Sequence, residues 1–252
     1  MTELAILATP PRPGLVLPRL SETAPVDPVE AATLYDAAFR DVLLAVEATG
    51  GRTIVNYRAD EDLPEDHREE TSAEAALRAI ARATLDDLDD VRFEPQIGSS
   101  RAARVGNTIT HLLREEGAKD AAMVDPTAPL VTRAAVDSAA MKLRRDEVVL
   151  GPAADGGVYF AGFAEPIDFD GAFTTPAVET LTDRAGDLDR SVEFIAPTHR
   201  LTTGAGLRSI VPELRARRTA GRPYPPHTAG VIDDLGLRVT DGEEGARLVR
   251  DR

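Results

Sequence analysis

A single carboxylate, Asp155, stands in a loop that is rich in small residues. The loop lies within Glu147–Gly162, where two short apolar runs flank it. Its conformationally special residues are Gly151, Pro152, Gly156 and Gly157. Glycine has no Cβ and proline fixes φ, so a ligand or a metal ion could lie close to this backbone. Because Asp155 is the only charged group in the loop, the pattern indicates a functional carboxylate, with an ordinary glycine-rich turn as the alternative.

Two other candidate loops follow predicted strands. Asp125 comes directly after the apolar run Ala121–Val124, and a stiff loop over residues 9–14 follows the run Leu4–Ala8. A third candidate, residues 99–106, precedes a helix, and its arginines and N–H groups could receive an anion; a solvated helix start explains it equally well. No serine, histidine and aspartate have spacing that supports hydrolysis, and there is no Walker-type lysine loop.

The elements that must position these side chains alternate along the chain. Apolar runs predict strands at residues 4–8, 53–57, 91–95, 121–124 and 191–195, and one strand on each side of the loop around Asp155. Helical spacing and caps such as Asp27 predict helices at residues 28–46, 72–85, 106–116, 132–143, 175–184, 206–218 and 229–235. This order predicts an α/β fold with a mostly parallel sheet, helices on both faces, and ligands at the carboxyl ends of the strands. We expect one domain over residues 1–239 and a charged tail over 240–252 that frays or forms a helix.

The composition restricts the partners. Among 252 residues, 43 are acidic and 29 are basic, and only Lys119 and Lys142 are lysine. A net charge of −14 argues against nucleic acid as a partner. Acidic surface with arginine in place of lysine is expected in a salt-loaded cytoplasm; an acidic protein from a GC-rich genome is the alternative. No run approaches the about 20 apolar residues of a membrane span, and no signal segment is evident, so we expect a cytoplasmic protein.

Two stretches resemble an uncharacterised glycosyltransferase-like family often found beside radical-SAM proteins. The first is Leu4–Leu20, followed by Glu30–Tyr35 and Arg40, and the second is Val148–Gly162, which is similar to the central signature of that family. The resemblance implies a Rossmann-like three-layer α/β/α sandwich of the nucleotide-diphospho-sugar transferase type. Such proteins hold a nucleotide over the strand ends with a divalent metal, and sugar nucleotidyltransferases and 2-phospholactate guanylyltransferase belong to the same superfamily.

The resemblance also implies roles for individual residues. Asp125 and Asp155 would be the catalytic carboxylates and the ligands of Mg²⁺ or Mn²⁺, and Arg12 and Arg19 would contact phosphates. The remaining residues expected in the nucleotide, sugar or acceptor site are Gly14, Gly151, Pro152, Gly156 and Gly157.

The chain departs from the family pattern at several positions. The family usually has lysines where this chain has Thr9 and Leu17. Its fourth strand ends Gly-Ser-Asp-x-Pro, and alignment on Pro129 puts Thr127 in place of the aspartate. A later Asp-Val-Asp-Thr stretch falls near residues 198–203, where neither aspartate is present.

The resemblance implies a glycosyltransferase-like protein that uses a nucleotide sugar and a small-molecule acceptor. One alternative is a nucleotidyltransferase, similar to the guanylyltransferases, that acts on a small phosphorylated acid. The other is a catalytically degenerate binding protein, which the departures from the family pattern motivate.

Overall fold

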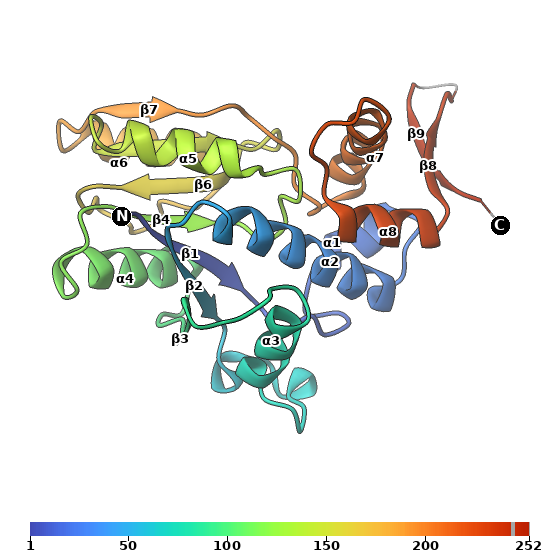
Figure 1. Ribbon diagram of the computed structural model, residues 1–252, viewed down its shortest axis with the longest axis horizontal. Coiled ribbons are helices and arrows are strands. Elements are labelled where there is room, and N and C mark those ends of the chain that lie inside the picture. Colours follow the sequence, from blue (N-terminus) through green and yellow to red (C-terminus); the bar gives the residue numbers. More distant parts are fainter. Residues whose placement is uncertain (243–244, 252) are drawn as a thin grey trace.

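A seven-stranded sheet forms the centre of the molecule, which we describe from a computed structural model over residues 1–242 and 245–251. Its strands are β1 (Glu3–Ala8), β2 (Arg52–Tyr57), β3 (Val91–Pro95), β4 (Ala121–Val124), β5 (Val148–Pro152), β6 (Val158–Phe163) and β7 (Val192–Phe194). They lie in the order β3-β2-β1-β4-β6-β5-β7 (Figure 1). Only β6 runs antiparallel to its neighbours, β4 and β5, within this sheet of described residues. The predicted, mostly parallel sheet is confirmed.

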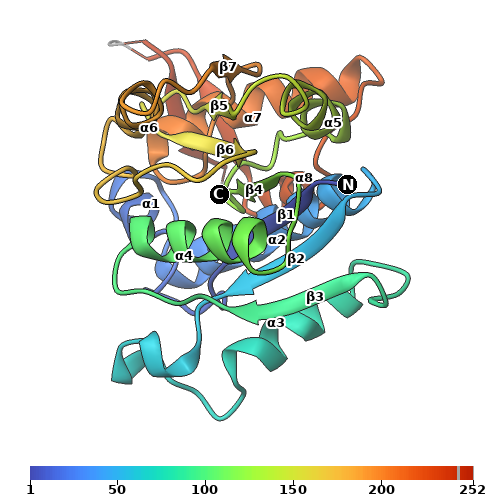
Figure 2. The same cartoon turned by 90° about the vertical axis from the view of Figure 1, so that its left-hand side faces the viewer.

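Eight α-helices accompany this sheet in the described residues. They are α1 (Pro18–Thr23), α2 (Pro28–Glu47), α3 (Ala73–Arg82), α4 (Arg101–Arg114), α5 (Arg133–Lys142), α6 (Ala177–Gly186), α7 (Gly204–Thr219) and α8 (Pro226–Asp234). Side chains of β1 alternate between two buried clusters: Leu4 and Ile6 pack with α2, α3 and α5, whereas Ala5 and Leu7 pack with α4 and α6. Figure 2 shows α4 and α6 across the sheet from α5. The molecule is therefore a three-layer α/β/α sandwich, as predicted.

Local sequence signals explain where the helices begin. Asp27 caps α2, because its carboxylate accepts the N–H groups of Val29 and Glu30 while Glu30 accepts the N–H of Asp27. Helix α4 begins at Arg101, five residues before the predicted start at 106. Ser100 is its N-cap and accepts the N–H of Ala103, a cap that the apolar pattern alone did not reveal.

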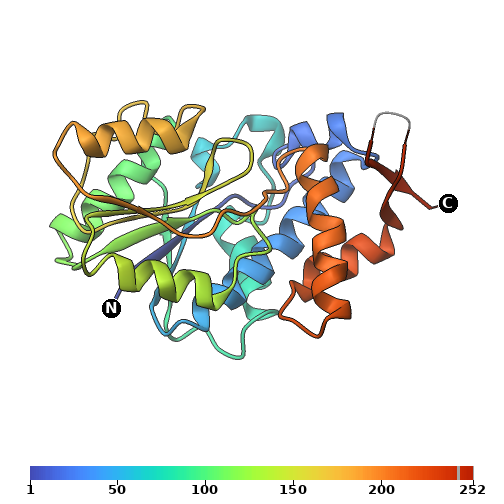
Figure 3. The same ribbon diagram turned by 90° about the horizontal axis from the view of Figure 1, so that it is seen from above.

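The end of the chain corrects one prediction. Where a fraying tail or a helix was expected, β8 (Leu237–Thr240) pairs with β9 (Arg247–Arg250) as an antiparallel hairpin. Leu237 is buried, and Leu248 packs against the same core, so alternate residues of the hairpin have a hydrophobic face. Figure 3 shows the hairpin beside α7 and α8 at one end of the molecule. None of the helices described is long and apolar enough to cross a membrane.

Candidate functional site

Asp125 is the most deeply buried carboxylate at the carboxyl edge of the sheet. It follows β4, is 2% exposed, and its backbone N–H donates to the carbonyl of Tyr159. The backbone N–H and the hydroxyl of Thr127 donate to its Oδ1 atom, at 2.9 and 2.7 Å. Arg101 and Arg200 donate to Oδ2, at 2.9 and 3.1 Å. Both carboxylate oxygens therefore have fixed partners, and two arginines compensate one buried charge.

Arg200 connects Asp125 to the carboxylate of the glycine loop. Its Nη2 and Nε atoms donate to Oδ2 of Asp155, at 2.6 and 3.2 Å. Thr202 lies 3.3 Å from the same oxygen, and the N–H of Gly157 donates to Oδ1 at 3.1 Å. The two predicted functional aspartates thus lie at one site, joined through a single guanidinium group. We call Asp125, Arg200 and Asp155 the central ion-pair network.

The network keeps both aspartates ionised. Burial would raise the pKa of Asp125, but the charges of Arg101 and Arg200 and the hydrogen bonds from Thr127 outweigh it and lower this pKa to about 2. Burial opposes ionisation of Asp155 as well, yet the hydrogen bonds and charge of Arg200 hold its pKa below the ordinary value. At neutral pH both side chains are therefore carboxylates and poor proton acceptors.

Acid should destabilise the fold through Asp125. Its pKa is lower in the folded chain than the ordinary value of 3.8, so its contribution to stability is complete above that pH and is lost toward about pH 2. We expect a loss of about 2 kcal/mol in this range, which urea unfolding at a series of pH values would measure. The pH dependence should be weaker in Asp125→Asn; the same acid-induced loss in both proteins would contradict this assignment.

The glycines of the loop make room for the protein's own side chains. A Cβ on Gly157 would lie 2.3 Å from Nη2 of Arg200, and one on Gly151 would lie 2.7 Å from the ring of Tyr159. Gly156 has φ of +77°, which favours glycine in this turn. Pro152 ends β5 at a register shift against β6. The close approach to this backbone is thus made by an arginine and a tyrosine; approach of a ligand here stays a prediction.

Arg12, which is predicted to contact phosphate, does not lie free at the edge of the sheet. Its side chain is 4% exposed, and its Nη atoms donate to the carbonyl oxygens of His67 and Thr71, at 2.6 and 2.7 Å, and to Asp60. Its Nε atom lies 3.6 Å from Glu69. These partners assign Arg12 to holding the loop over residues 60–71 in place.

Replacing Arg12 by lysine should therefore affect stability and not ligand binding. Lysine keeps the charge but cannot donate to two carbonyl groups and Asp60 in the same planar geometry. We expect a loss of about 1–2 kcal/mol in urea unfolding and an unchanged affinity for any nucleotide that the chain binds. A large loss of nucleotide affinity with unchanged stability would instead support direct contact between Arg12 and phosphate.

The other residues predicted in the first loop lie apart from the network's contacts. Gly14 has φ of +78° and lies close to the ring of His67, and Arg19 is exposed on the short helix α1. Among the described residues, neither Gly14 nor Arg19 forms a hydrogen bond or an ion pair with Asp125, Arg200 or Asp155. Their predicted role in phosphate binding stays a prediction.

The network as arranged does not fit a divalent cation. The guanidinium of Arg200 already lies between Asp125 and Asp155, and both carboxylates accept hydrogen bonds from it. In residues 1–242 and 245–251 no three His, Cys, Asp or Glu side chains gather as a metal site would require. A metal could use these two aspartates only if Arg200 moved away.

A hollow of about 260 Å³ lies beside the network. Asp155, His199 and Arg200 line one part of it, and the start of α7 with Arg208 lines the other. The solvent-facing side of the network therefore lines this hollow. The side chain of Asp155 is accordingly 38% exposed.

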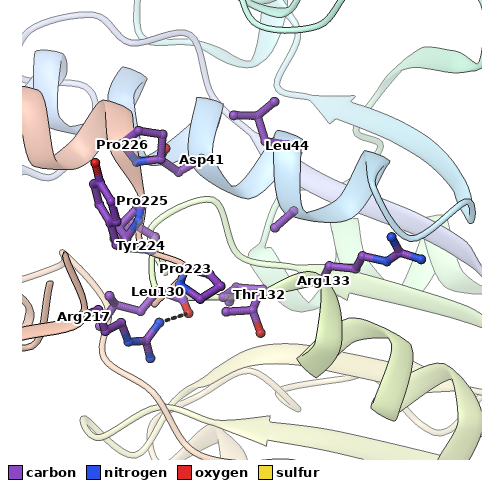
Figure 4. Close-up of a pocket in the computed structure, with 13 residues that line it drawn as sticks. Asp41, Leu44, Leu130, Thr132, Arg133, Arg217, Pro223, Tyr224, Pro225 and Pro226 are labelled. Carbon is purple, nitrogen blue, oxygen red and sulfur yellow. Dashed lines mark hydrogen bonds between the residues drawn. The ribbon is translucent and has the colours of Figure 1, made fainter. Parts of the chain in front are cut away.

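A second hollow, of about 210 Å³, lies between α2, the loop after β4 and residues Pro223–Pro226 (Figure 4). Asp41 on its wall accepts the N–H groups of His227 and Thr228, so this carboxylate anchors the start of α8. None of the residues predicted to be functional lines this hollow. We therefore place the candidate site at the central ion-pair network.

Arg200 is the residue that sequence reasoning missed. In the sequence, residues 198–203 differ from the family pattern in lacking its two aspartates, and nothing there marks Arg200. The glycine content of the loop around Asp155 carried a signal, because Gly157 leaves space that a long cationic side chain fills. Nothing local in the sequence identifies which arginine that is.

Comparisons with known proteins agree with this architecture. Residues 65–189 match the family described as "Uncharacterized protein conserved in bacteria (DUF2064)". No curated protein matches the chain in sequence. A solved structure from Desulfovibrio desulfuricans G20, described as that of a candidate nucleotide-diphospho-sugar transferase, is 20% identical, has a TM-score of 0.72, and matches over 92% of this chain and 94% of that chain. The fold is therefore that of the nucleotide-diphospho-sugar transferases.

Two further solved structures are more distant. 4-Diphosphocytidyl-2C-methyl-D-erythritol synthase from Anaerococcus prevotii is 12% identical over 82% of this chain and 94% of that chain, with a TM-score of 0.46. Rv0371c from Mycobacterium tuberculosis, in a complex with manganese, is 15% identical over 82% of this chain and 96% of that chain, with a TM-score of 0.45.

Proposed function

We propose that this chain is a nucleotide-dependent transferase, because residues 65–189 match the DUF2064 family and the fold is that of the nucleotide-diphospho-sugar transferases. Its ligand would be a nucleotide or a nucleotide sugar, and the group would pass to a small-molecule acceptor. The observation that carries the proposal is the central ion-pair network, which lies at the carboxyl edge of the sheet, where open α/β sheets bind ligands.

The cation of the network, Arg200, suits a phosphorylated ligand. Arg200 gives one N–H from each of its nitrogens to the aspartates, so its two terminal nitrogens each keep a further donor for a phosphate. Charge that develops on a departing nucleotide would be offset by this fixed guanidinium. Asp155, ionised and partly exposed, would orient Arg200 and accept a hydrogen bond from an acceptor hydroxyl.

The predicted use of Mg²⁺ or Mn²⁺ remains a hypothesis within this proposal. When bound, such an ion would supply positive charge at the phosphates. Arg200 supplies positive charge at the same aspartates.

Calorimetric titration would test the proposal. The chain would be titrated with nucleoside diphosphates, nucleoside triphosphates and nucleotide sugars, each with and without Mn²⁺. We expect one of these ligand classes to bind and Asp155→Asn to weaken that binding. If none binds at millimolar concentration under either condition, the proposal is wrong.

One observation favours binding without turnover as the second candidate. The lowered pKa values of Asp125 and Asp155 leave the network without a carboxylate suited to act as a general base at neutral pH. Product analysis separates the possibilities, because a glycosyltransferase releases a nucleoside diphosphate, a nucleotidyltransferase releases pyrophosphate, and a binding protein releases neither.

A further inference from the structure

Three arginines gather beside the central ion-pair network. Arg58 directly follows β2, and its backbone N–H donates to the carbonyl of Ala8 at the end of β1. Arg101 and Arg104 lie in the first turn of α4, which follows β3. Gln96 connects the ends of β1 and β2. Its Nε2 atom donates to the carbonyl oxygens of Ala8 and Asn56, at 3.1 and 2.7 Å. The three arginines therefore follow the carboxyl ends of β2 and β3, beside the end of β1.

Two of these arginines have few partners for their charge. Arg58 donates from Nη2 to the carbonyl of Asp62 at 2.6 Å, and Arg104 has a single contact, from Nη1 to the carbonyl of Gly98 at 3.5 Å. The Nε atoms of both are buried and have no hydrogen-bond partner among the described residues. Within that part of the chain, neither arginine has a carboxylate at ion-pair distance, although the chain has 43 acidic residues.

The electrostatic environment of Arg104 is unfavourable as it stands. Burial lowers the pKa of its guanidinium, and the like charges of Arg58 and Arg101 lower it further, against a smaller opposite effect of Asp62. A half-buried charge without a counter-charge destabilises a fold, and buried polar atoms without partners are uncommon in native proteins. An anion between the three side chains would compensate the charge of Arg104 and accept hydrogen bonds from the buried Nε atoms that have no partner.

Phosphate is the anion that this arrangement fits best. Arginine presents a planar set of donors that matches phosphate oxygens, and such charge-assisted hydrogen bonds are stronger than neutral ones. The first turn of α4 has no acidic residue to repel an anion, and the helix dipole adds to the attraction. Arg101 also donates to Asp125, so the cluster is continuous with the central ion-pair network.

We propose that Arg58, Arg101 and Arg104 form a subsite that binds a phosphate or diphosphate group. This inference rests on the proposed function in one respect: the group would belong to the nucleotide ligand. The phosphates would then lie over β2, β3 and the start of α4, and the acceptor would lie on the side of Asp155. The subsite therefore defines the orientation of the ligand, with its phosphates near Arg104 and the acceptor near Asp155.

Pyrophosphate binding to Arg104→Gln tests the subsite. Wild-type protein should bind sodium pyrophosphate in calorimetry, and its melting temperature should rise more than in sodium chloride of equal ionic strength. Arg104→Gln should bind about tenfold more weakly. Arg114→Gln is the matched control, since Arg114 is an exposed residue of the same helix that pairs with Glu165, and it should behave like the wild type.

Stability without ligand separates a binding role from a structural one. In phosphate-free buffer Arg104→Gln should be at least as stable as the wild type, because it removes an unpaired charge. If Arg104 served only to hold Gly98, the variant would be less stable with and without pyrophosphate, which would overturn the proposal. Equal pyrophosphate affinity of variant and wild type would also overturn it.

The subsite and the proposed function can fail separately. If a nucleotide binds equally well to Arg104→Gln and wild-type protein but is lost in Arg200→Gln, the subsite is wrong and the proposed function stands. If pyrophosphate binding depends on Arg104 while no nucleotide or nucleotide sugar binds, the subsite stands and the proposed function is wrong.

Discussion

Asp125→Asn should lower the free energy of unfolding by about 3–5 kcal/mol, because removal of one partner from a buried ion pair leaves the others uncompensated. The asparagine oxygen can still accept from Thr127. Its amide group would then point hydrogen atoms at Arg101 and Arg200, where the carboxylate now accepts two hydrogen bonds. Arg101 and Arg200 would lose the negative charge that they now share. The amide N–H groups of the asparagine would face only the N–H donors of these arginines.

Urea unfolding followed by circular dichroism at neutral pH would measure this loss. Asp137→Asn is a suitable control, because Asp137 is an exposed partner of Arg133 on α5, and its loss should change stability by about 0.5 kcal/mol or less. A similar small change in both variants would show that the contacts of Asp125 contribute little to stability.

Most of the sheet and its helices could be predicted from the sequence, because local patterns determine them. Strand β1 is a continuous apolar run with both faces buried, and Asp27 with Glu30 is a complete capping signal. The hairpin of β8 and β9 was missed for the opposite reason. Its strands are short and charged, and they are ordered by packing against α7 and α8, which no local pattern shows.

The candidate site could be predicted only in part. Asp125 and Asp155 follow recognisable strands, and the structure brings them together. Their connection through Arg200 spans 75 and 45 residues along the chain, and it depends on the strand order β4-β6-β5-β7, which the sequence does not display. For Arg12, a basic residue in a loop at the strand ends suggests phosphate, whereas its partners in the structure are the carbonyl groups of a neighbouring loop. Its contact with phosphate stays a prediction.

Arg200→Gln should have the largest effect on ligand binding. The glutamine side chain is shorter and neutral, so Asp125 would keep only one arginine and Asp155 would lose its ion pair. If the proposed function is right, the affinity for the nucleotide should fall by about a hundredfold, because charge-assisted hydrogen bonds to phosphate are lost and uncompensated carboxylates repel it. Calorimetric titration of the nucleotide measures the change. An affinity within about twofold of the wild type would show that the ligand does not contact this network.

Gly157→Ala tests the position of the Arg200 guanidinium without removing a charge. Its methyl group would lie 2.3 Å from Nη2 of Arg200, so the guanidinium must move while every charged residue remains. Because this shift disturbs the hydrogen bonds of Arg200 to Asp125 and Asp155, the free energy of unfolding should fall by about 1–3 kcal/mol. Nucleotide affinity should fall by about tenfold. Gly230→Ala is the control: no atom lies within 4 Å of the added methyl group, and a helical alanine should be neutral or stabilising. Weaker binding in Gly157→Ala but not in Gly230→Ala would show that the position of Arg200, and not only its charge, determines recognition.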